Sequence, residues 1–218
     1  DITELPDHVK NAVVAVEDDQ FYNHHGINFI AFGRAILVNL KNWSFTQGGG
    51  TITMQLARNV FLTQEKTIMR KLEEFLWAVQ IERKYSKEEI LEAYLNEAYL
   101  NHGAYGIEAG ARTFFGKAAK DLTVSEAALI AGVIRWPTRY SPFVNPDIAV
   151  DRRNFVLSRM VDTGYLTAEE AAIAKAEPLN LAERRERVVE ARYFVDHVIQ
   201  QLTETYGEAT VFGGGLRV

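Results

Sequence analysis

A repeated helix-start signal divides the sequence. In this signal, a Ser or Thr hydroxyl caps the first turn of a helix, and a Glu three residues later reaches back to the cap. The pairs are Ser86 with Glu89, Thr123 with Glu126, and Thr167 with Glu170. Apolar residues recur at helical spacing along most of the chain, and strand-like alternation is confined to 209–211 and 216–218. The sequence therefore predicts an all-α domain of about nine or ten helices.

Composition limits the classes of protein that remain. The chain has 218 residues, of which 47% are hydrophobic and 24% charged, and these values are typical of a folded domain. Its formal net charge of −5 is unlike the basic surface of a general nucleic-acid-binding protein, so we expect no nucleic-acid partner. The absence of cysteine excludes disulfides and thiolate zinc sites. No apolar run reaches the ~20 residues that span a bilayer.

A polar block follows the first apolar helix. Glu17, Asp18 and Asp19 lie close in sequence to His24 and His25. Carboxylates beside histidines can carry out acid–base chemistry or hold a metal ion. The ordinary alternative is a polar helix end that leads into a turn, and composition alone leaves both interpretations open.

Two further blocks could bind an anion. Three glycines at 48–50 precede Thr51, and backbone N–H groups at such a helix start can approach an anion. The run lacks the ending of a P-loop and could equally be a flexible linker. Downstream, helical spacing aligns Lys66, Arg70 and Glu74, with Lys71 three residues before Glu74. This row indicates either a phosphate site or a solvated face with ordinary ion pairs.

Three later residues are weaker candidates. Tyr94 and Asn96 belong to a Tyr-Leu-Asn sequence near the end of a predicted helix, and Arg153 lies in the sequence Arg-Arg-Asn. Tyr94 and Asn96 have an ordinary interpretation as packing and capping residues. Arg153 is a second candidate phosphate contact, or simply a surface residue.

Read in order, these blocks resemble the glycosyltransferase family 51 domain of class A penicillin-binding proteins and monofunctional transglycosylases. The resemblance runs from about Leu5 to the C-terminus, and four motifs in register are highly specific. The first motif is matched by Glu17, Asp18, Phe21, His24 and Gly26. The second is matched by Gly48, Gly49, Thr51, Ile52, Thr53, Gln55 and Leu56. The third is matched by Arg70, Lys71 and Glu74, and the fourth ends in Tyr94, Leu95 and Asn96.

The sequence departs from the family pattern at three positions. Gly50 replaces the usual serine and Met54 replaces the first glutamine of a pair, whose second member is Gln55. Arg58 stands where lysine is common, which keeps the charge. We expect activity to survive, although the missing hydroxyl and amide put any donor contacts made by those groups in question.

The resemblance implies a fold and a reaction. The fold is lysozyme-like and all-α, with a large head lobe and a small membrane-facing jaw lobe near 27–50. The reaction joins lipid II units into β-1,4-linked glycan with inversion at MurNAc C1 and release of undecaprenyl diphosphate. Glu17 is implied as the general base on the acceptor hydroxyl, which is a poor nucleophile unaided. Glu74 is implied on the donor side. The implied substrate-binding residues are Asp18, His24, Thr51, Gln55, Arg58, Lys66, Arg70, Lys71, Tyr94, Asn96 and Arg153.

The resemblance also implies the surroundings of the domain. A divalent cation, Mg²⁺ or Mn²⁺, would assist the departing diphosphate, and no organic cofactor is expected. The partners would be lipid II, lipid-linked glycan, the membrane surface and cell-wall synthesis proteins. We interpret the chain as part of a longer protein on the extracytoplasmic face of the bacterial membrane. A transmembrane helix would precede it, and a strand or linker at 209–218 would lead to a transpeptidase domain.

Two rival functions remain from sequence alone. A lysozyme-like lytic enzyme cuts the same polymer, and a non-catalytic domain could bind lipid II or a wall protein without turnover. A shared fold cannot separate them. The cationic row beside Glu74 and the apolar segment after Ile27 favour synthesis, because a hydrolase needs neither.

Overall fold

The computed structural model describes residues 1–33, 50–62, 68–183, 198, 201–203 and 205–206. Lys66, most of the expected jaw segment at 27–50, and the expected strand at 209–218 lie outside these residues. The chain divides into two compact units, Asp1–Ala182 and Glu183–Val218. In the second unit, residues 201–203 are helical.

The described part of the first unit is helical, and its only β-type pairing there is an isolated bridge between Tyr99 and Tyr105. The α-helices are α1 (Asp7–Glu17), α3 (Ile52–Phe61), α4 (Ile68–Lys84), α5 (Lys87–Glu97), α6 (Gly106–Phe115), α7 (Val124–Ile134), α8 (Pro146–Asp162) and α9 (Ala168–Ala176). Short 3-10 turns occupy Ile2–Glu4, Phe21–Asn23 and Ala119–Asp121. The all-α prediction is confirmed for these residues. None of the described helices is both long and apolar enough to cross a bilayer.

The predicted helix starts are also confirmed. Complete capping boxes open α5, α7 and α9. In each, the cap hydroxyl accepts a bond from the third backbone N–H, and the Glu carboxylate accepts one from the cap N–H. Two of the amide groups that a helix leaves unsatisfied at its start are thereby paired.

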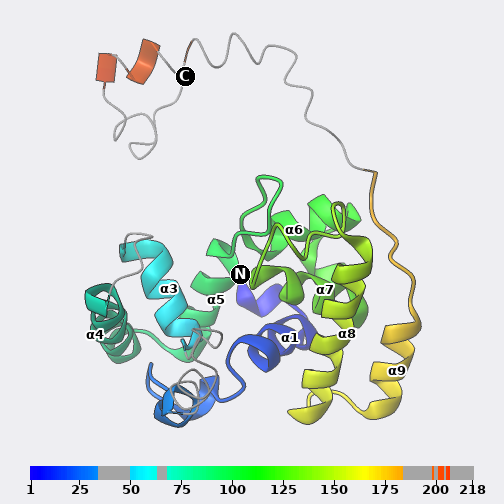
Figure 1. Cartoon of the computed structure of the whole chain (residues 1–218), viewed down its shortest axis with the longest axis horizontal. Helices are drawn as coiled ribbons and strands as arrows, with labels where there is room; N and C mark the ends of the chain where they lie inside the picture. Colours follow the sequence, from blue (N-terminus) through cyan, green and yellow to red (C-terminus); the bar gives the residue numbers. More distant parts are fainter. Residues whose placement is uncertain (34–49, 63–67, 184–197, 199–200, 204, 207–218) are drawn as a thin grey trace. The chain divides into compact units, whose positions relative to one another are not determined.

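Helix α7 forms the centre of the core. Its residues from Ala127 to Val133 are all buried, as expected for a helix that is apolar all round. It packs against α1, α6, α8 and α9 (Figure 1). Gly132 allows the close approach to α8, since a Cβ there would lie 2.9 Å from the Cγ atom of Arg152. This packing holds α1 against α7 and α8.

Helix α3 packs against both α4 and α5 (Figure 1). The apolar side of α4 does not lie wholly in the core, because Leu72 is 51% exposed and Leu76 is 64% exposed. The face that does pack inward carries Glu74, Ala78 and Ile81. The hydrophobic pattern therefore located the helix correctly but did not reveal that much of its apolar side is uncovered.

Candidate active site

Glu17 is the last residue of α1, and its two carboxylate oxygens have different surroundings. Oε2 accepts a 2.9 Å hydrogen bond from the Gln55 amide on α3. The Gln55 carbonyl in turn accepts a 3.1 Å bond from the Tyr94 hydroxyl on α5. Oε1 is buried and has no hydrogen-bond partner among the described residues. One oxygen of Glu17 is thus held in place, and the other can accept a proton donor.

Burial raises the pKa of Glu17 above its ordinary value, and the Gln55 hydrogen bond opposes this effect. The positive charges of Arg152, Arg135 and Arg58 also oppose it, in that order of size. The net direction is upward, which makes the carboxylate a better proton acceptor than an exposed glutamate. The arginines nevertheless favour the ionised form that a general base requires.

Tyr94 is 1% exposed. Burial, followed by the negative charge of Glu17, raises the pKa of Tyr94 well above its usual range. Its hydroxyl therefore stays protonated and donates to Gln55, which in turn is oriented to donate to Glu17. In this structure Tyr94 and Gln55 are positioning residues for the carboxylate.

Asp18 connects the turn after α1 to the start of α3 by hydrogen bonds. Its Oδ2 atom forms a 2.9 Å hydrogen bond with His24 Nε2 and accepts a 3.1 Å bond from the Ile52 amide at the start of α3. A carboxylate at a helix N-terminus is favourable because amide donors and the helix dipole both point to it. Asp18 and His24, predicted to bind substrate, are engaged with their own chain here.

Thr51 is likewise occupied. It caps α3 by accepting a 3.2 Å bond from the Met54 amide, and its hydroxyl donates to the Gly26 carbonyl at 2.6 Å. Gly26 has a φ of +85°, and a Cβ there would lie 2.9 Å from the Ala78 carbonyl oxygen of α4. Thr51 therefore joins the turn after α1 to α3 and α4, and its side chain has little capacity left for a substrate.

The predicted cationic row forms a second cluster on α4. Glu74 is 1% exposed, and its oxygens pair with Arg70 and with Lys71, the latter at 2.8 Å. With both oxygens engaged, Glu74 orients the two cations in this structure. Lys71 remains about one-third exposed. Lys66, the other predicted member, lies outside the described residues.

Gly50 connects the two clusters. It lines a hollow of about 160 Å³ together with Glu17, Asp18 and Thr51. A Cβ added at Gly50 would lie 3.6 Å from Lys71 Nζ, which is ordinary contact distance. Gly50 thus lies in the lining of the hollow beside the candidate base and also next to Lys71, which is not itself part of that lining.

Two of the three departures from the family pattern, Gly50 and Met54, can now be placed. The serine expected at position 50 would have stood next to Lys71, so Gly50 leaves this ammonium group more open. Met54 is 1% exposed, so the amide absent there would have been buried in the core. The absence of a glutamine amide at position 54 therefore does not remove a group that faces the Glu17 hollow.

The structure does not bring Asn96 to Glu17. Asn96 lines a separate hollow of about 320 Å³ together with Glu92 and Leu95. It is two residues beyond Tyr94 on α5, and a two-residue step turns the side chain by about 200° on a helix. The predicted substrate contact at Asn96 is therefore not supported by its position.

Arg153 is also placed away from Glu17. It is 2% exposed, and its guanidinium donates to the Glu177 and Lys175 carbonyls at 2.7 and 2.8 Å and to Ser125 Oγ at 3.2 Å. It thus holds the end of α9 against α7 and α8. The neighbouring Arg152, which was not selected from the sequence, is the one whose charge reaches Glu17.

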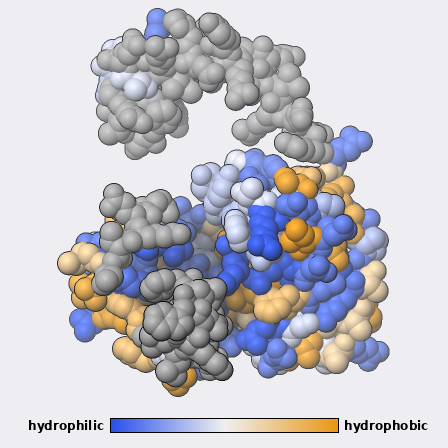
Figure 2. All heavy atoms as spheres, in the orientation of Figure 1, coloured by the Kyte–Doolittle hydropathy of each residue, from blue (hydrophilic) through white to orange (hydrophobic). Residues whose placement is uncertain are grey.

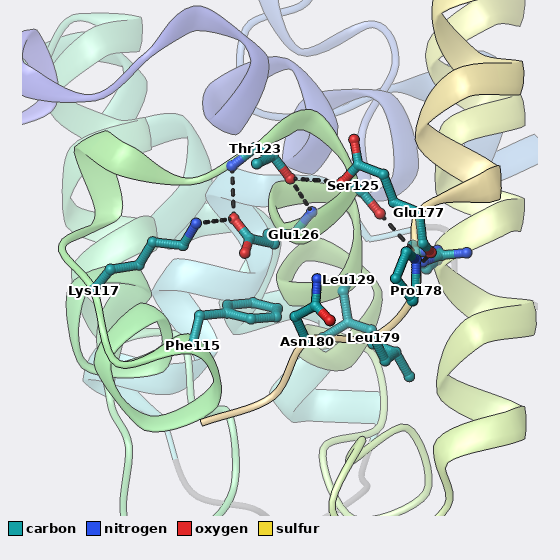
Figure 3. Close-up of a pocket in the computed structure, with 11 residues that line it drawn as sticks. Phe115, Lys117, Thr123, Ser125, Glu126, Leu129, Glu177, Pro178, Leu179 and Asn180 are labelled. Carbon is teal, nitrogen blue, oxygen red and sulfur yellow. Dashed lines mark hydrogen bonds and ion pairs between the residues drawn. The ribbon is translucent and has the colours of Figure 1, made fainter. Parts of the chain in front are cut away.

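The hollow at Arg153 is larger than the one at Glu17. Its volume is about 440 Å³, and its polar side chains bond to one another (Figure 3). Lys117 pairs with Glu126 at 2.7 Å, and Thr123 donates to Glu177 at 3.2 Å. These mutual contacts satisfy the polar groups and indicate a structural role for this region.

No group of three or more metal-ligating His, Asp or Glu residues occurs in the described part of the chain. Asp18 and His24 are hydrogen-bonded to each other, and Asp18 also accepts a hydrogen bond from the Ile52 amide at the start of α3. The described residues therefore offer no ready-made site for a divalent cation, and the expectation of Mg²⁺ or Mn²⁺ stays a prediction.

One all-α unit thus holds a half-buried glutamate at the end of α1 and, on α4, two cations paired with a buried carboxylate. The chain belongs to the Transglycosylase family, which matches residues 1–161. The family predicted from the four motifs is therefore confirmed.

Several bacterial proteins that are similar to this chain are much longer than it. The chain is 44% identical over 212 residues to penicillin-binding protein 1A of Aquifex aeolicus, covering 97% of this chain and 29% of that protein. It is 42% identical over 219 residues to penicillin-binding protein 1F of Bacillus subtilis, covering 98% and 30%. It is 41% identical to Escherichia coli penicillin-binding protein 1A over 214 residues, covering 98% and 25%. The chain thus spans under a third of each relative.

Among solved structures, penicillin-binding protein 1A from Haemophilus influenzae is similar with a TM-score of 0.48 and 31% sequence identity. The similarity covers 73% of this chain and 20% of that chain.

Proposed function

We propose that this chain is a peptidoglycan glycosyltransferase that polymerises lipid II, with Glu17 as the general base. The observation that carries the proposal is the arrangement of the Glu17 carboxylate. Oε2 is fixed by Gln55, whereas the buried Oε1 accepts no hydrogen bond from the described residues. A sugar hydroxyl that bonds to Oε1 would be oriented for deprotonation in a partly desolvated setting.

In the proposed reaction, the acceptor GlcNAc 4-hydroxyl transfers its proton to Glu17 as its oxygen attacks C1 of the donor MurNAc. The bond between C1 and the lipid diphosphate breaks, and the diphosphate leaves with the electron pair. Attack opposite the leaving group gives a β-1,4 link with inversion. Proton loss from Glu17 to solvent restores the base for the next addition.

The departing diphosphate requires positive charge, and Arg70 and Lys71 supply it in this proposal. Glu74 holds both cations in fixed positions, which lowers the reorganisation needed when charge develops. Gly50 lines the Glu17 hollow and puts no side chain next to the Lys71 ammonium group. Arg58, whose charge reaches Glu17, would serve the anionic part of a substrate on the base side.

The substrates are lipid-linked, and an exposed apolar surface supports contact with a membrane. This apolar surface consists of Phe29, Ile30, Phe61, Met69, Leu72 and Leu76. Each of the six side chains is at least 51% exposed. Figure 2 shows the orange colour of apolar residues gathered over α4. Soluble proteins rarely expose so many large apolar groups, and insertion into lipid would cover them.

The relatives are penicillin-binding proteins several times longer than this chain. We therefore place the chain in a longer protein on the extracytoplasmic face of the bacterial membrane. The proposed partners are lipid II, lipid-linked glycan, a transpeptidase domain and other cell-wall synthesis proteins.

A lipid II polymerisation assay tests the base assignment. The Glu17→Gln variant keeps the shape of the side chain and removes its basicity, so we expect polymerisation to fall by at least about 10²-fold. Lipid II binding should remain close to that of wild type, and the melting temperature should be no lower than that of wild type. Glu97→Gln, the same change at an exposed carboxylate, is the matched control. Unchanged polymerisation by Glu17→Gln would refute the base assignment.

The same assay separates synthesis from the two rival functions. Wild-type chain incubated with lipid II, and without preformed glycan, should yield polymer. If it only degrades preformed glycan, it is a lytic enzyme. If it binds lipid II without product, it is a binding domain.

A further inference from the structure

The segment between α7 and α8 presents arginines and an aromatic ring at the surface. Arg135, Trp136 and Arg139 are exposed, and Trp136 is 54% exposed. The Arg139 guanidinium lies 5.0 Å from the centroid of the Trp136 ring. Stacking of this kind orders a long side chain while its N–H donors stay accessible. Arg139 is therefore partly organised for a ligand before one binds.

Neither Arg135 nor Arg139 has an ion-pair partner within the described residues. No carboxylate oxygen of this part of the chain comes within 4.0 Å of either side chain. The protein as a whole carries a formal net charge of −5. Two arginines without carboxylate partners on an acidic protein form a local site for an anionic ligand.

The backbone of this segment is held in place from three directions. Asn101 donates to the Pro137 carbonyl at 3.5 Å, and Asn145 donates to the Arg139 carbonyl at 3.1 Å. His102 and the buried Ser141 form a 2.8 Å hydrogen bond. Exposed side chains on so constrained a backbone are presented in a defined arrangement, as a binding surface requires.

The segment lies close to the candidate base. Arg135 is the C-cap of α7, and α7 packs against α1, the helix that ends at Glu17. The charge of Arg135 also reaches the Glu17 carboxylate. Glu17 is the group that meets the acceptor sugar in the proposed reaction. A ligand group bound at Arg135 and Arg139 would therefore belong to the acceptor, close to its reacting hydroxyl, rather than to the leaving diphosphate beside Lys71.

On these grounds we infer that Arg135 and Arg139, with Trp136 as their support, bind carboxylates of the peptide attached to the acceptor sugar. This inference rests on the proposed function, and it names the substrate feature that the site would distinguish. Arginine forks match carboxylates in geometry and charge. The segment thus favours acceptors with free peptide carboxylates over acceptors in which these groups are amidated.

Binding of a soluble probe tests the inference without lipid or turnover. The probe is a disaccharide-peptide with free carboxylates, and its comparison compound carries the same peptide with the carboxylates amidated. We expect the wild-type chain to bind the free-carboxylate form about five- to tenfold more tightly, which corresponds to two exposed arginine–carboxylate contacts. The double variant Arg135→Gln/Arg139→Gln should bind both forms equally. Arg83→Gln removes one exposed, unpaired arginine of α4 and should behave as wild type.

Two further variants test the role of the ring. Trp136→Ala should lose part of the preference for the free-carboxylate form, and Trp136→Phe should retain more of it, because a phenyl ring still supports Arg139. In turnover, the single variant Arg139→Gln, which leaves the charge of Arg135 near Glu17 in place, should raise KM for lipid II with free carboxylates and leave kcat unchanged.

Two outcomes would overturn the inference. One is equal binding of both probes by the wild-type chain, even if lipid II is polymerised. The other is an unchanged preference in the double variant. Failure of polymerisation in the Glu17 experiment would be a separate result, because the binding measurement does not depend on catalysis.

Discussion

The hydrogen bond from Gln55 to Glu17 should set the pH range in which the chain is active. Gln55 stabilises the ionised carboxylate, and this effect lowers a pKa that burial raises. Replacing Gln55 with Met keeps the length of the side chain and removes the donor. The pKa of Glu17 should then rise further, because burial is opposed by one contact fewer.

The size of the effect follows from the strength of the bond. A hydrogen bond to a charged group contributes about 1.5–3 kcal/mol, and one pKa unit corresponds to 1.36 kcal/mol. Glu17 is half-buried, so water can replace part of the lost interaction, and the lower limit of about one unit is the better expectation. The acid limb of kcat/KM should therefore move upward by about one pH unit.

The assay is the pH profile of lipid II polymerisation. Well below the pKa, Gln55→Met should be about tenfold slower than wild type, and the two rates should converge as Glu17 becomes fully ionised. Tyr94→Phe removes the bond that orients Gln55 but keeps the amide, so its shift should be smaller. An acid limb that stays in place in Gln55→Met, with a uniform loss at all pH values, would show that Gln55 does not tune the base.

Two predictions concern stability. Arg153→Ala should lower the free energy of unfolding by about 3 kcal/mol and the melting temperature by about 6–12 °C, since it leaves buried carbonyls of the α9 end unpaired; a variant that melts like wild type would refute the structural role of Arg153. Glu17→Gln should be more stable than wild type near neutral pH, because burial disfavours the charged carboxylate. The raised folded-state pKa means that this difference in stability should shrink as pH falls through that pKa and vanish below the unfolded-state value. Denaturant unfolding at several pH values measures the difference, and a difference that stays constant with pH would contradict the reasoning.

The helix boundaries were predictable because their signals are local. A Ser or Thr with a Glu three residues later needs only its own first turn to form the capping box, and all three such boxes are present. The motif around Glu17 was predictable for a different reason, since it came from resemblance to a family. Composition alone left a polar helix end as an equal alternative.

The choice between Arg152 and Arg153 required three-dimensional information, although a signal existed. The buried residues of α8 are Ala149, Arg153, Val156, Leu157 and Met160. Arg153 therefore lies on the apolar stripe, four residues after one member and three before the next. An arginine in such a stripe is more often anchored to backbone carbonyls inside the protein than available to a ligand.

The apolar stripe of α4 was predictable from the sequence pattern, but what covers that stripe was not. Periodicity shows that Leu72 and Leu76 share a side of the helix, and it does not show what covers that side. In the structure both are more than half exposed. Neither the sequence pattern nor helix propensity distinguishes a face that meets protein from one that meets lipid.

Asp18 uses one oxygen, Oδ2, to bond to both His24 and the Ile52 amide. The effect of mutating this aspartate on activity is therefore hard to interpret. An alanine scan scored only by product formation would rank Asp18 beside Glu17. The Asp18 variant would fail because α3 shifts, whereas the Glu17 variant would fail because the proton acceptor is gone. Amide exchange at Ile52 distinguishes the two kinds of failure. A residue adjacent in sequence to a base can thus be indispensable and still never meet the substrate.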